Sequence, residues 1–292
     1  MADLALLLLT LAWGTTFTFV KDVLEVASPG LFLAARFGVA AAVLAAVWAV
    51  RRDRPTPGLW RHGLLLGLAM LAGFALQTLG LRFTTPARSG FITGLSVLVV
   101  PFLARFVLGR PVKGASWGGV ALAVVGLGVL SFAEGVTAEV RVGDLLTLGC
   151  ALAYALQIVW TSEWAPRHPL APFVLAQVLV TAVAAGLAVP FEGAFLRAGG
   201  ADRFAATVAY TGVVMTAGTF FVMNWAQRHT TAVRAALIFS LEPVSAALFS
   251  HLYGGEPLGP PVWIGGALIV AGVLLGEVGG ALEARAGRAE AA

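Results

Sequence analysis

Ten runs of about twenty mostly apolar residues follow one another along the 292-residue chain. Short segments rich in proline, glycine and arginine separate them, such as 55–58 and 259–261. About twenty apolar residues form a helix long enough to cross a bilayer, whereas open sheet edges are not satisfied in lipid. The pattern therefore predicts an all-α integral membrane protein with ten transmembrane helices. The predicted helices are 3–23, 30–50, 61–81, 87–108, 114–133, 143–163, 169–190, 205–225, 232–252 and 262–280.

The composition supports the membrane class and excludes several functions. Mean hydropathy is +0.89 and 12% of residues are charged, about half the share in soluble domains. The four histidines stand in separate segments without metal-ligand spacing, and neither a Walker loop nor a dinucleotide fingerprint is present. The arginines gather at helix ends, which indicates no nucleic-acid partner. We therefore expect no metal and no cofactor, and a lipid bilayer as the surroundings of the chain.

The chain contains one half written twice, since residues 77–126 read again as 223–272, shifted by 146 positions. The earlier helices match at a shift of 141, which pairs Asp3 with Asp144 and Arg36 with Gln177. Other matched pairs are Thr84 with Thr230, Arg88 with Arg234, Ser96 with Glu242, Gly119 with Gly265 and Gly126 with Gly272. The duplication predicts a first five-helix repeat at 1–138, a second at 139–280 and a disordered tail at 281–292.

Five helices per repeat is an odd number, so the second repeat must enter the membrane from the side opposite to the first. The two repeats are then inverted, related by a pseudo-two-fold axis in the membrane plane. Proteins of this design bind substrates between the repeats near the bilayer midplane and open alternately to each side. The duplication thus favours a transporter over a membrane enzyme.

Lysine and arginine near the helix ends predict the orientation. The side that carries the N-terminus holds twice as many of them as the opposite side. Because such residues are retained in cytoplasm-facing loops, we expect both termini to be cytoplasmic. The first apolar run lacks a basic leader and a small-residue cleavage site, so we interpret it as the first span of a multi-pass protein of the bacterial plasma membrane.

Several short motifs resemble the EamA branch of the drug/metabolite transporter superfamily. They are Trp13-Gly14, Arg36, the stretches 77–85 and 87–91, Leu241-Glu242-Pro243 and Gly255-Glu256-Pro257. Each is weak alone, but their order and duplication are specific and span about 3–280. The resemblance implies ten helices and a central cavity lined by helices 1, 3, 4, 6, 8 and 9. It also implies export of amino acids, other small metabolites or toxic organic compounds. Arg110 departs from the pattern, because its second-repeat match is Glu256.

Two charged residues within the spans are the first site candidates, since ionisable groups at membrane depth are costly and often functional. Arg36 could be the counter-ion of a substrate carboxylate, a side chain that snorkels to the interface, or a tie to helix-end carbonyls. Glu242 precedes Pro243, which frees a backbone carbonyl and bends the helix. It could carry a coupling proton or bind a substrate amine, or it could be a structural acid bonded to neighbouring helices.

Neutral polar and aromatic residues within the spans complete the candidate binding set, with Trp13 and Tyr154 expected near the midplane. Gln77 is expected to line the cavity, whereas Asn224 is slightly more typical of a helix–helix hydrogen bond. Aromatic residues at this depth either pack helices or line a site for apolar or cationic groups. The aromatic candidates are Trp13, Phe17, Phe91, Tyr154, Trp160 and Phe239.

The sequence therefore predicts a secondary transporter that exports amino acids or similar small amphipathic metabolites by alternating access. Proton coupling through Glu242 and uncoupled facilitated diffusion stay open as alternatives, as does a drug exporter of the same fold. A metabolite importer or phosphate-ester antiporter of the same fold would need several buried lysine or arginine residues, and Arg36 alone is too few. A channel would need a ring of polar residues, and a membrane enzyme would need a clustered catalytic set and would leave the duplication unexplained. Homodimerisation through the glycine-rich helices 114–133 or 262–280 is a further open alternative.

Overall fold

The computed structural model describes residues 1–112, 114–131, 138–254 and 258–276. These residues form helices throughout, and the described part holds no β-strand, only an isolated bridge between Ala27 and Leu196. Eight helical segments are long and apolar enough to cross a membrane, and two shorter apolar helices accompany them. The predicted all-α membrane class is confirmed, with the fifth and tenth predicted spans appearing as the shorter pair.

Several predicted spans consist of two or three shorter elements. The elements are α1 (Ala2–Gly14), α2 (Thr16–Val23), α3 (Pro29–Arg51), α4 (Leu59–Gly80), α5 (Pro86–Gly94), α6 (Ser96–Phe106), α7 (Gly114–Ser131), α8 (Ala138–Trp164), η1 (Ala165–Arg167), α9 (Leu170–Ala188), η2 (Val189–Phe191), α10 (Ala201–Ala209), η3 (Tyr210–Gly218), α11 (Thr219–Gln227), α12 (Ala232–Phe239), α13 (Glu242–Gly254) and α14 (Pro260–Leu274). Of these, η3 is a π-helix between α10 and α11, so the eighth span is α10–η3–α11.

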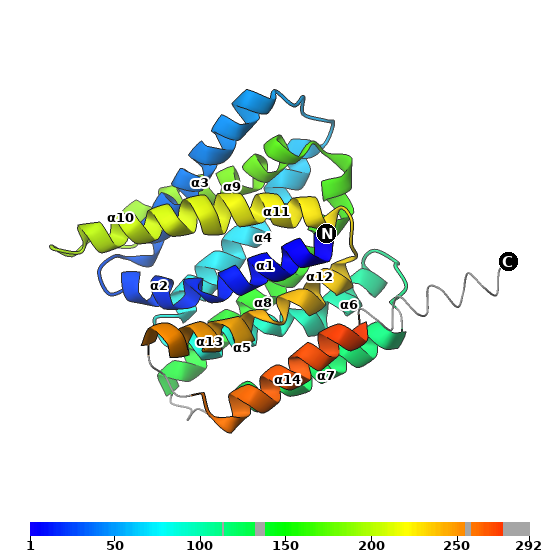
Figure 1. Cartoon of the computed structure of the whole chain (residues 1–292). Coiled ribbons are helices and arrows are strands. Elements are labelled where there is room, and N and C mark those ends of the chain that lie inside the picture. Colours follow the sequence, from blue (N-terminus) through cyan, green and yellow to red (C-terminus); the bar gives the residue numbers. More distant parts are fainter. Residues whose placement is uncertain (113, 132–137, 255–257, 277–292) are drawn as a thin grey trace.

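The chain begins at one end of the bundle, which we name the N-terminal face; the other end is the opposite face. The N-terminus lies beside the start of α12, whereas α2, α5 and α10 lie toward the opposite face (Figure 1). Because successive spans alternate in direction, α1 and α12 start at the N-terminal face, and α5 and α8 start at the opposite face.

The pairing of α7 with α14 displays the two-fold relation between the repeats. The two helices lie side by side along one flank of the bundle (Figure 1). A Cβ atom added to Gly119 would lie 2.5 Å from the carbonyl oxygen of Gly272, and one added to Gly126 would lie 2.5 Å from that of Gly265. The 146-residue shift matches Gly119 of α7 with Gly265 of α14, and Gly126 of α7 with Gly272 of α14. The two contacts are therefore the same contact with the helices exchanged, as a two-fold axis requires.

Three spans are broken near their middle, and two of the breaks are related by the repeat. Span 4 breaks at Leu95 and span 9 at Ser240–Leu241, positions that the 146-residue shift superposes. The hydroxyl of Ser240 donates to the carbonyl of Leu237 at 2.6 Å, and Pro243 supplies no amide donor. Span 1 breaks at Thr15, whose hydroxyl donates to Ala12. The bend predicted beside Glu242 is therefore present.

The glycine-rich helices predicted as a dimer surface use those glycines within the chain, because α7 and α14 pack against one another through them. Homodimerisation stays a prediction. Arg110 donates to Glu163, near the end of α8, at 2.5 Å. Residues 255–257, with the Gly255-Glu256-Pro257 motif, and the predicted tail 281–292 lie outside the described residues. So do residues 132–137, next to the predicted repeat boundary at 138/139.

Candidate functional site: the central cavity

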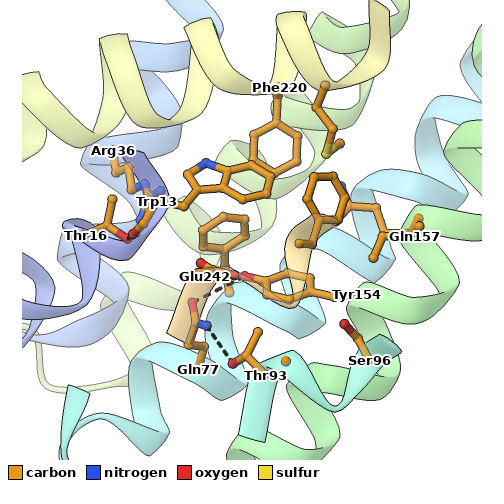
Figure 2. A pocket seen from close by; sticks show the side chains of 15 residues that line it. Trp13, Thr16, Arg36, Gln77, Thr93, Ser96, Tyr154, Gln157, Phe220 and Glu242 are labelled. Atoms are coloured by element: carbon orange, nitrogen blue, oxygen red, sulfur yellow. Dashed lines mark hydrogen bonds between the residues drawn. The ribbon is translucent and has the colours of Figure 1, made fainter. Parts of the chain in front are cut away.

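A cavity of about 60 Å³ lies where the three broken spans meet α3, α4, α8 and α11. Its walls come from both repeats and include the helices that the family resemblance implies, with α3 in addition. Figure 2 shows the lining side chains converging from several helices on one space. The lining residues are Trp13, Thr16, Arg36, Phe74, Gln77, Thr93, Gly94, Ser96, Tyr154, Gln157, Ile158, Phe220, Met223, Phe239 and Glu242.

Arg36 brings a positive charge to the cavity from the first third of α3. Its side chain is buried, its Nε donates to the hydroxyl of Thr216 at 2.8 Å, and its guanidinium lies 4.7 Å from the ring centre of Phe74. None of the ion pairs among the described residues includes Arg36. Its burial is inconsistent with the snorkelling alternative. The guanidinium has up to five N–H groups, so donors remain for a ligand.

Glu242 brings a negative charge to the same cavity. It is the first residue of α13, directly after the break in span 9, where the helix dipole favours an anionic group. In the described part of the chain its carboxylate has no hydrogen-bond or ion-pair partner. The structural alternative, an acid bonded to neighbouring helices, stays open. The matched position in the first repeat, Ser96, also lines the cavity.

A chain of hydrogen bonds connects the polar wall of the cavity. The hydroxyl of Tyr154 donates to Gln77 Oε1 at 3.4 Å, and Gln77 Nε2 donates to the hydroxyl of Thr93 at 3.0 Å (Figure 2). Thr93 in turn lies 4.0 Å from the sulfur of buried Cys150. These contacts join α4, α5 and α8, so the polar wall is held by helices of both repeats.

The remaining walls are aromatic. The ring of Trp13 lies 5.8 Å from that of Phe220 and 5.5 Å from that of Phe239, and Phe74 meets Tyr154 edge-on at 5.5 Å. Trp13 Nε1 donates to the hydroxyl of Thr219 at 2.9 Å, which fixes the indole against the cavity. Aromatic faces suit apolar or cationic parts of a ligand.

Six of the ten binding residues predicted from the sequence line the cavity: Trp13, Arg36, Gln77, Tyr154, Phe239 and Glu242. The other four lie elsewhere. Phe17 packs in a separate apolar cluster near Gly90, and Phe91 packs against the main core. Trp160 stacks on Trp164, and Asn224 accepts a hydrogen bond from Gln177 within the bundle. The three aromatic side chains face neighbouring helices, so the aromatic character that suggested a site serves packing. Asn224 makes the helix–helix hydrogen bond that the sequence slightly favoured.

The sequence interpretation missed nine lining residues, and helical spacing could have found three of them. Residues three or four apart share one face of a helix. Phe74 precedes Gln77 by three positions, and Gln157 and Ile158 follow Tyr154 by three and four. The other six lie beside the helix breaks or on α11: Thr16, Thr93, Gly94, Ser96, Phe220 and Met223. Their place depends on how α5, α6 and α11 cross, which no local pattern encodes.

A bundle of apolar helices in two inverted repeats around a central cavity of mixed polarity defines a multi-pass membrane transporter. The amino-acid sequence matches the EamA-like transporter family over residues 1–132 and again over residues 141–276. The chain therefore belongs to that family, and the predicted resemblance is confirmed. Each of the two matches falls within one of the two predicted repeats.

Relatives extend along nearly the whole chain. An uncharacterized transporter of Archaeoglobus fulgidus is 31% identical over 281 residues, which cover 94% of this chain and 85% of the relative. The uncharacterized transporter YwfM of Bacillus subtilis is 26% identical over 286 residues, covering 94% and 92%. A crystal structure that shares 19% of residues superposes with a TM-score of 0.77 and covers 95% of this chain and 97% of its own. That likeness concerns the fold alone.

Proposed function

We propose that the chain exports amino acids or similar small amphipathic metabolites by alternating access. The observation that carries this proposal is the placement of Arg36 and Glu242 on one cavity. A zwitterion has a carboxylate for Arg36 and an ammonium group for Glu242. A buried charge without a partner is costly, so a ligand that supplies the opposite charge is strongly favoured.

The walls and the size of the cavity support the same class of substrate. The aromatic rings of Trp13, Phe220 and Phe239 offer a surface for an apolar side chain. A volume of about 60 Å³ holds a few water-sized groups, at roughly 10–15 Å³ each. The conformation described here therefore has room for at most a small molecule.

Glu242 is the candidate for ion coupling. An acid at a helix break, facing the central cavity, can exchange a proton with whichever side of the membrane is open. Uncoupled diffusion is the alternative, in which Glu242 serves substrate binding alone. The cellular setting we propose is the bacterial plasma membrane, with both termini cytoplasmic and substrate moving outward, on the basis of the lysine and arginine bias.

Transport by the reconstituted protein tests the proposal. Proteoliposomes are loaded with a panel of labelled amino acids, and efflux is measured with and without an imposed pH gradient, for wild type and Glu242→Gln. Glu25→Gln is the matched control, because its side chain is exposed, 70%, at the opposite face. We expect gradient-driven transport in wild type and the control, and only downhill exchange in Glu242→Gln. Equal downhill flux in all three proteins would make the chain a facilitator, and no flux of any amino acid would refute the substrate class.

A second candidate function is export of organic cations, favoured by the aromatic walls together with Glu242. An aromatic cage beside an acid is an ordinary site for a quaternary ammonium group. Arg36 opposes it, because a cation without a carboxylate leaves this guanidinium unpaired. The panel therefore includes a quaternary ammonium compound, and transport of that compound in preference to every amino acid would favour the second candidate.

A further inference from the structure

Four of the described ion pairs join the repeats, and the duplication relates two of them to one another. Arg88, at the start of span 4, pairs with Asp144, at the start of span 6. Arg234, at the start of span 9, pairs with Asp3, at the start of span 1. Arg88 matches Arg234, and Asp144 matches Asp3, so each pair takes one residue from each repeat. The first lies at the opposite face and the second at the N-terminal face.

The pair at the opposite face is tightly built. Arg88 donates from Nε to both carboxylate oxygens of Asp144 at 2.9 Å, and from Nη2 to Oδ2 at 2.7 Å. The two side chains are 10% and 21% exposed. Next to them, Lys21 Nζ donates to the carbonyl oxygens of Leu81 and Thr84, at 2.5 and 2.8 Å. Charge-assisted and multidentate bonds of this kind are the strong ones.

Backbone packing closes the same end. A Cβ atom added to Gly80 would lie 3.0 Å from the carbonyl oxygen of Gly143, and one added to Gly143 would lie 3.0 Å from that of Gly80. The ends of spans 3 and 6 therefore touch through their backbones beside the ion pair. A substrate cannot pass between them in this conformation.

The related pair at the N-terminal face is looser. Arg234 Nη2 lies 3.1 Å from Asp3 Oδ2, and the side chains are 39% and 43% exposed. The other oxygen of Asp3 is buried without a hydrogen-bond partner among the described residues. The repeat matches of Gly80 and Gly143 are Ala226 and Ala2, so this end lacks the small glycine pair that lets the backbones meet.

Polar groups behind this looser pair are buried and unbonded. The match of Lys21 is Ser162, whose hydroxyl is too short to reach the next helix. Side-chain polar atoms without a hydrogen-bond partner in the described structure include those of Gln157, Thr161, Ser162, Gln227 and Thr230. An unbonded buried polar group costs roughly 1–3 kcal/mol, and water would remove that cost. Gln157 also lines the central cavity, and Thr161 lies one turn further along the same face of α8.

We propose that the two repeat-related ion pairs are alternate latches of the transport cycle. Arg88–Asp144 holds the opposite face shut, Asp3–Arg234 is the weaker latch in this conformation, and the unbonded polar groups line the route that fills with water when it opens. The inference rests on the alternating access of the proposed function. It adds the residues that hold each gate and predicts which gate opens first.

Accessibility of the cavity to a thiol reagent tests the latches without any knowledge of the substrate. Cys150 is the one cysteine of the chain, so Cys150→Ser provides a cysteine-free background. Ser96→Cys then places a reporter thiol in the cavity. A membrane-impermeant maleimide is added from one side of oriented proteoliposomes at a time, and a cleavable tag before Met1 identifies the N-terminal side.

We expect Asp144→Asn to raise the labelling rate from the opposite side roughly tenfold or more, because it breaks a charge-assisted bidentate bond. Asp3→Asn should raise the rate from the N-terminal side by roughly two- to fivefold, as an exposed ion pair contributes less. Exchanging the charges, in Arg88→Asp with Asp144→Arg, should restore the wild-type rate. Asp53→Asn is the matched control, because Asp53 pairs with Arg51 within one repeat at the N-terminal face and should change neither rate.

The proposal would be overturned if Asp3→Asn and Asp144→Asn raised the labelling rate equally from the two sides. It would also be overturned if neither variant changed the labelling rate. Each variant is also checked for a single symmetric peak in size-exclusion chromatography, so a folding defect is separated from gate opening. Labelling needs no substrate. A protein that moves no amino acid but shows side-specific labelling would therefore refute the proposed substrate and leave the latches standing.

Discussion

Substituting alanine into the glycine contacts between α7 and α14 tests the inverted repeat directly. Gly119→Ala and Gly272→Ala each place a Cβ atom 2.5 Å from the carbonyl oxygen of the partner glycine. Gly126→Ala does the same toward Gly265. Contacts under 3.0 Å are essentially unknown for real Cβ atoms, and a helix backbone cannot rotate away as a side chain can. The two helices must therefore separate to accommodate the methyl group.

The expected magnitude follows from two opposing effects. Overpacking of a close contact costs typically 1–3 kcal/mol, and the upper part of that range applies when the obstacle is backbone. The greater helix propensity of alanine returns roughly 0.8–1.0 kcal/mol. A net loss of about 1–2 kcal/mol is expected for each variant. Gly128→Ala is the control on the same helix, because a Cβ atom there meets nothing within 4 Å, and it should be neutral or slightly stabilising.

The measurement is the thermal unfolding midpoint in detergent, followed by intrinsic tryptophan fluorescence. For each kcal/mol the midpoint of a protein of about this size shifts by roughly 2–4 °C. The two-fold axis adds a stricter requirement, since Gly119 and Gly265 occupy equivalent positions. Their alanine variants should therefore lose similar stability. Equal midpoints for Gly126→Ala and Gly128→Ala would refute the close contact, and unequal losses for Gly119→Ala and Gly265→Ala would refute the symmetry.

Two further predictions concern the cavity and the N-terminal face. Thr216→Val removes the acceptor of Arg36 Nε and should raise the KM of a carboxylate substrate by roughly fivefold, about 1 kcal/mol. Thr216→Ser keeps the hydroxyl and should restore the wild-type KM. Transport of an amine without a carboxylate is the control. Burial, and then neighbouring positive side chains, lower the pKa of His168 below its ordinary 6.5, and its ring bonds to His62 at 2.7 Å. As the pH falls, the imidazole of His168 is therefore protonated in the unfolded chain before it is protonated in the folded chain. The free energy of unfolding should then fall as the pH drops below 6.5. His168→Asn should flatten the dependence of the unfolding midpoint on pH.

The length of the apolar runs and the duplication made the fold predictable from the sequence. The first is a local property of the chain, and the second appears when the two halves of the chain are compared. The bend beside Glu242 followed from Pro243 for the same reason. The assignment of aromatic side chains did not follow, since the face that Phe17 or Trp160 presents depends on how its helix crosses its neighbours. Arg36 likewise shows which features follow from the sequence and which depend on how the helices pack. The sequence located it within a span, but its burial against Thr216 required the arrangement of α3 and the π-helix η3.

The differences between the repeats matter as much as their likeness. In a fully symmetric protein, positions 36 and 177 would hold the same residue, and so would positions 96 and 242. The two sides of its cavity would then carry the same charge. Here each repeat contributes one charge of opposite sign to a scaffold that is otherwise doubled. Gln177 has left the site and bonds Asn224 at 3.1 Å instead. In the proposed transport cycle, the symmetric glycines and the two proposed latches serve two equivalent openings of the scaffold, whereas the unequal charges fix how a zwitterionic substrate lies within it. Exchanging Ser96 and Glu242 between repeats should therefore keep the fold and impair binding, and a double variant that transports as well as wild type would show that the position of the charge does not matter.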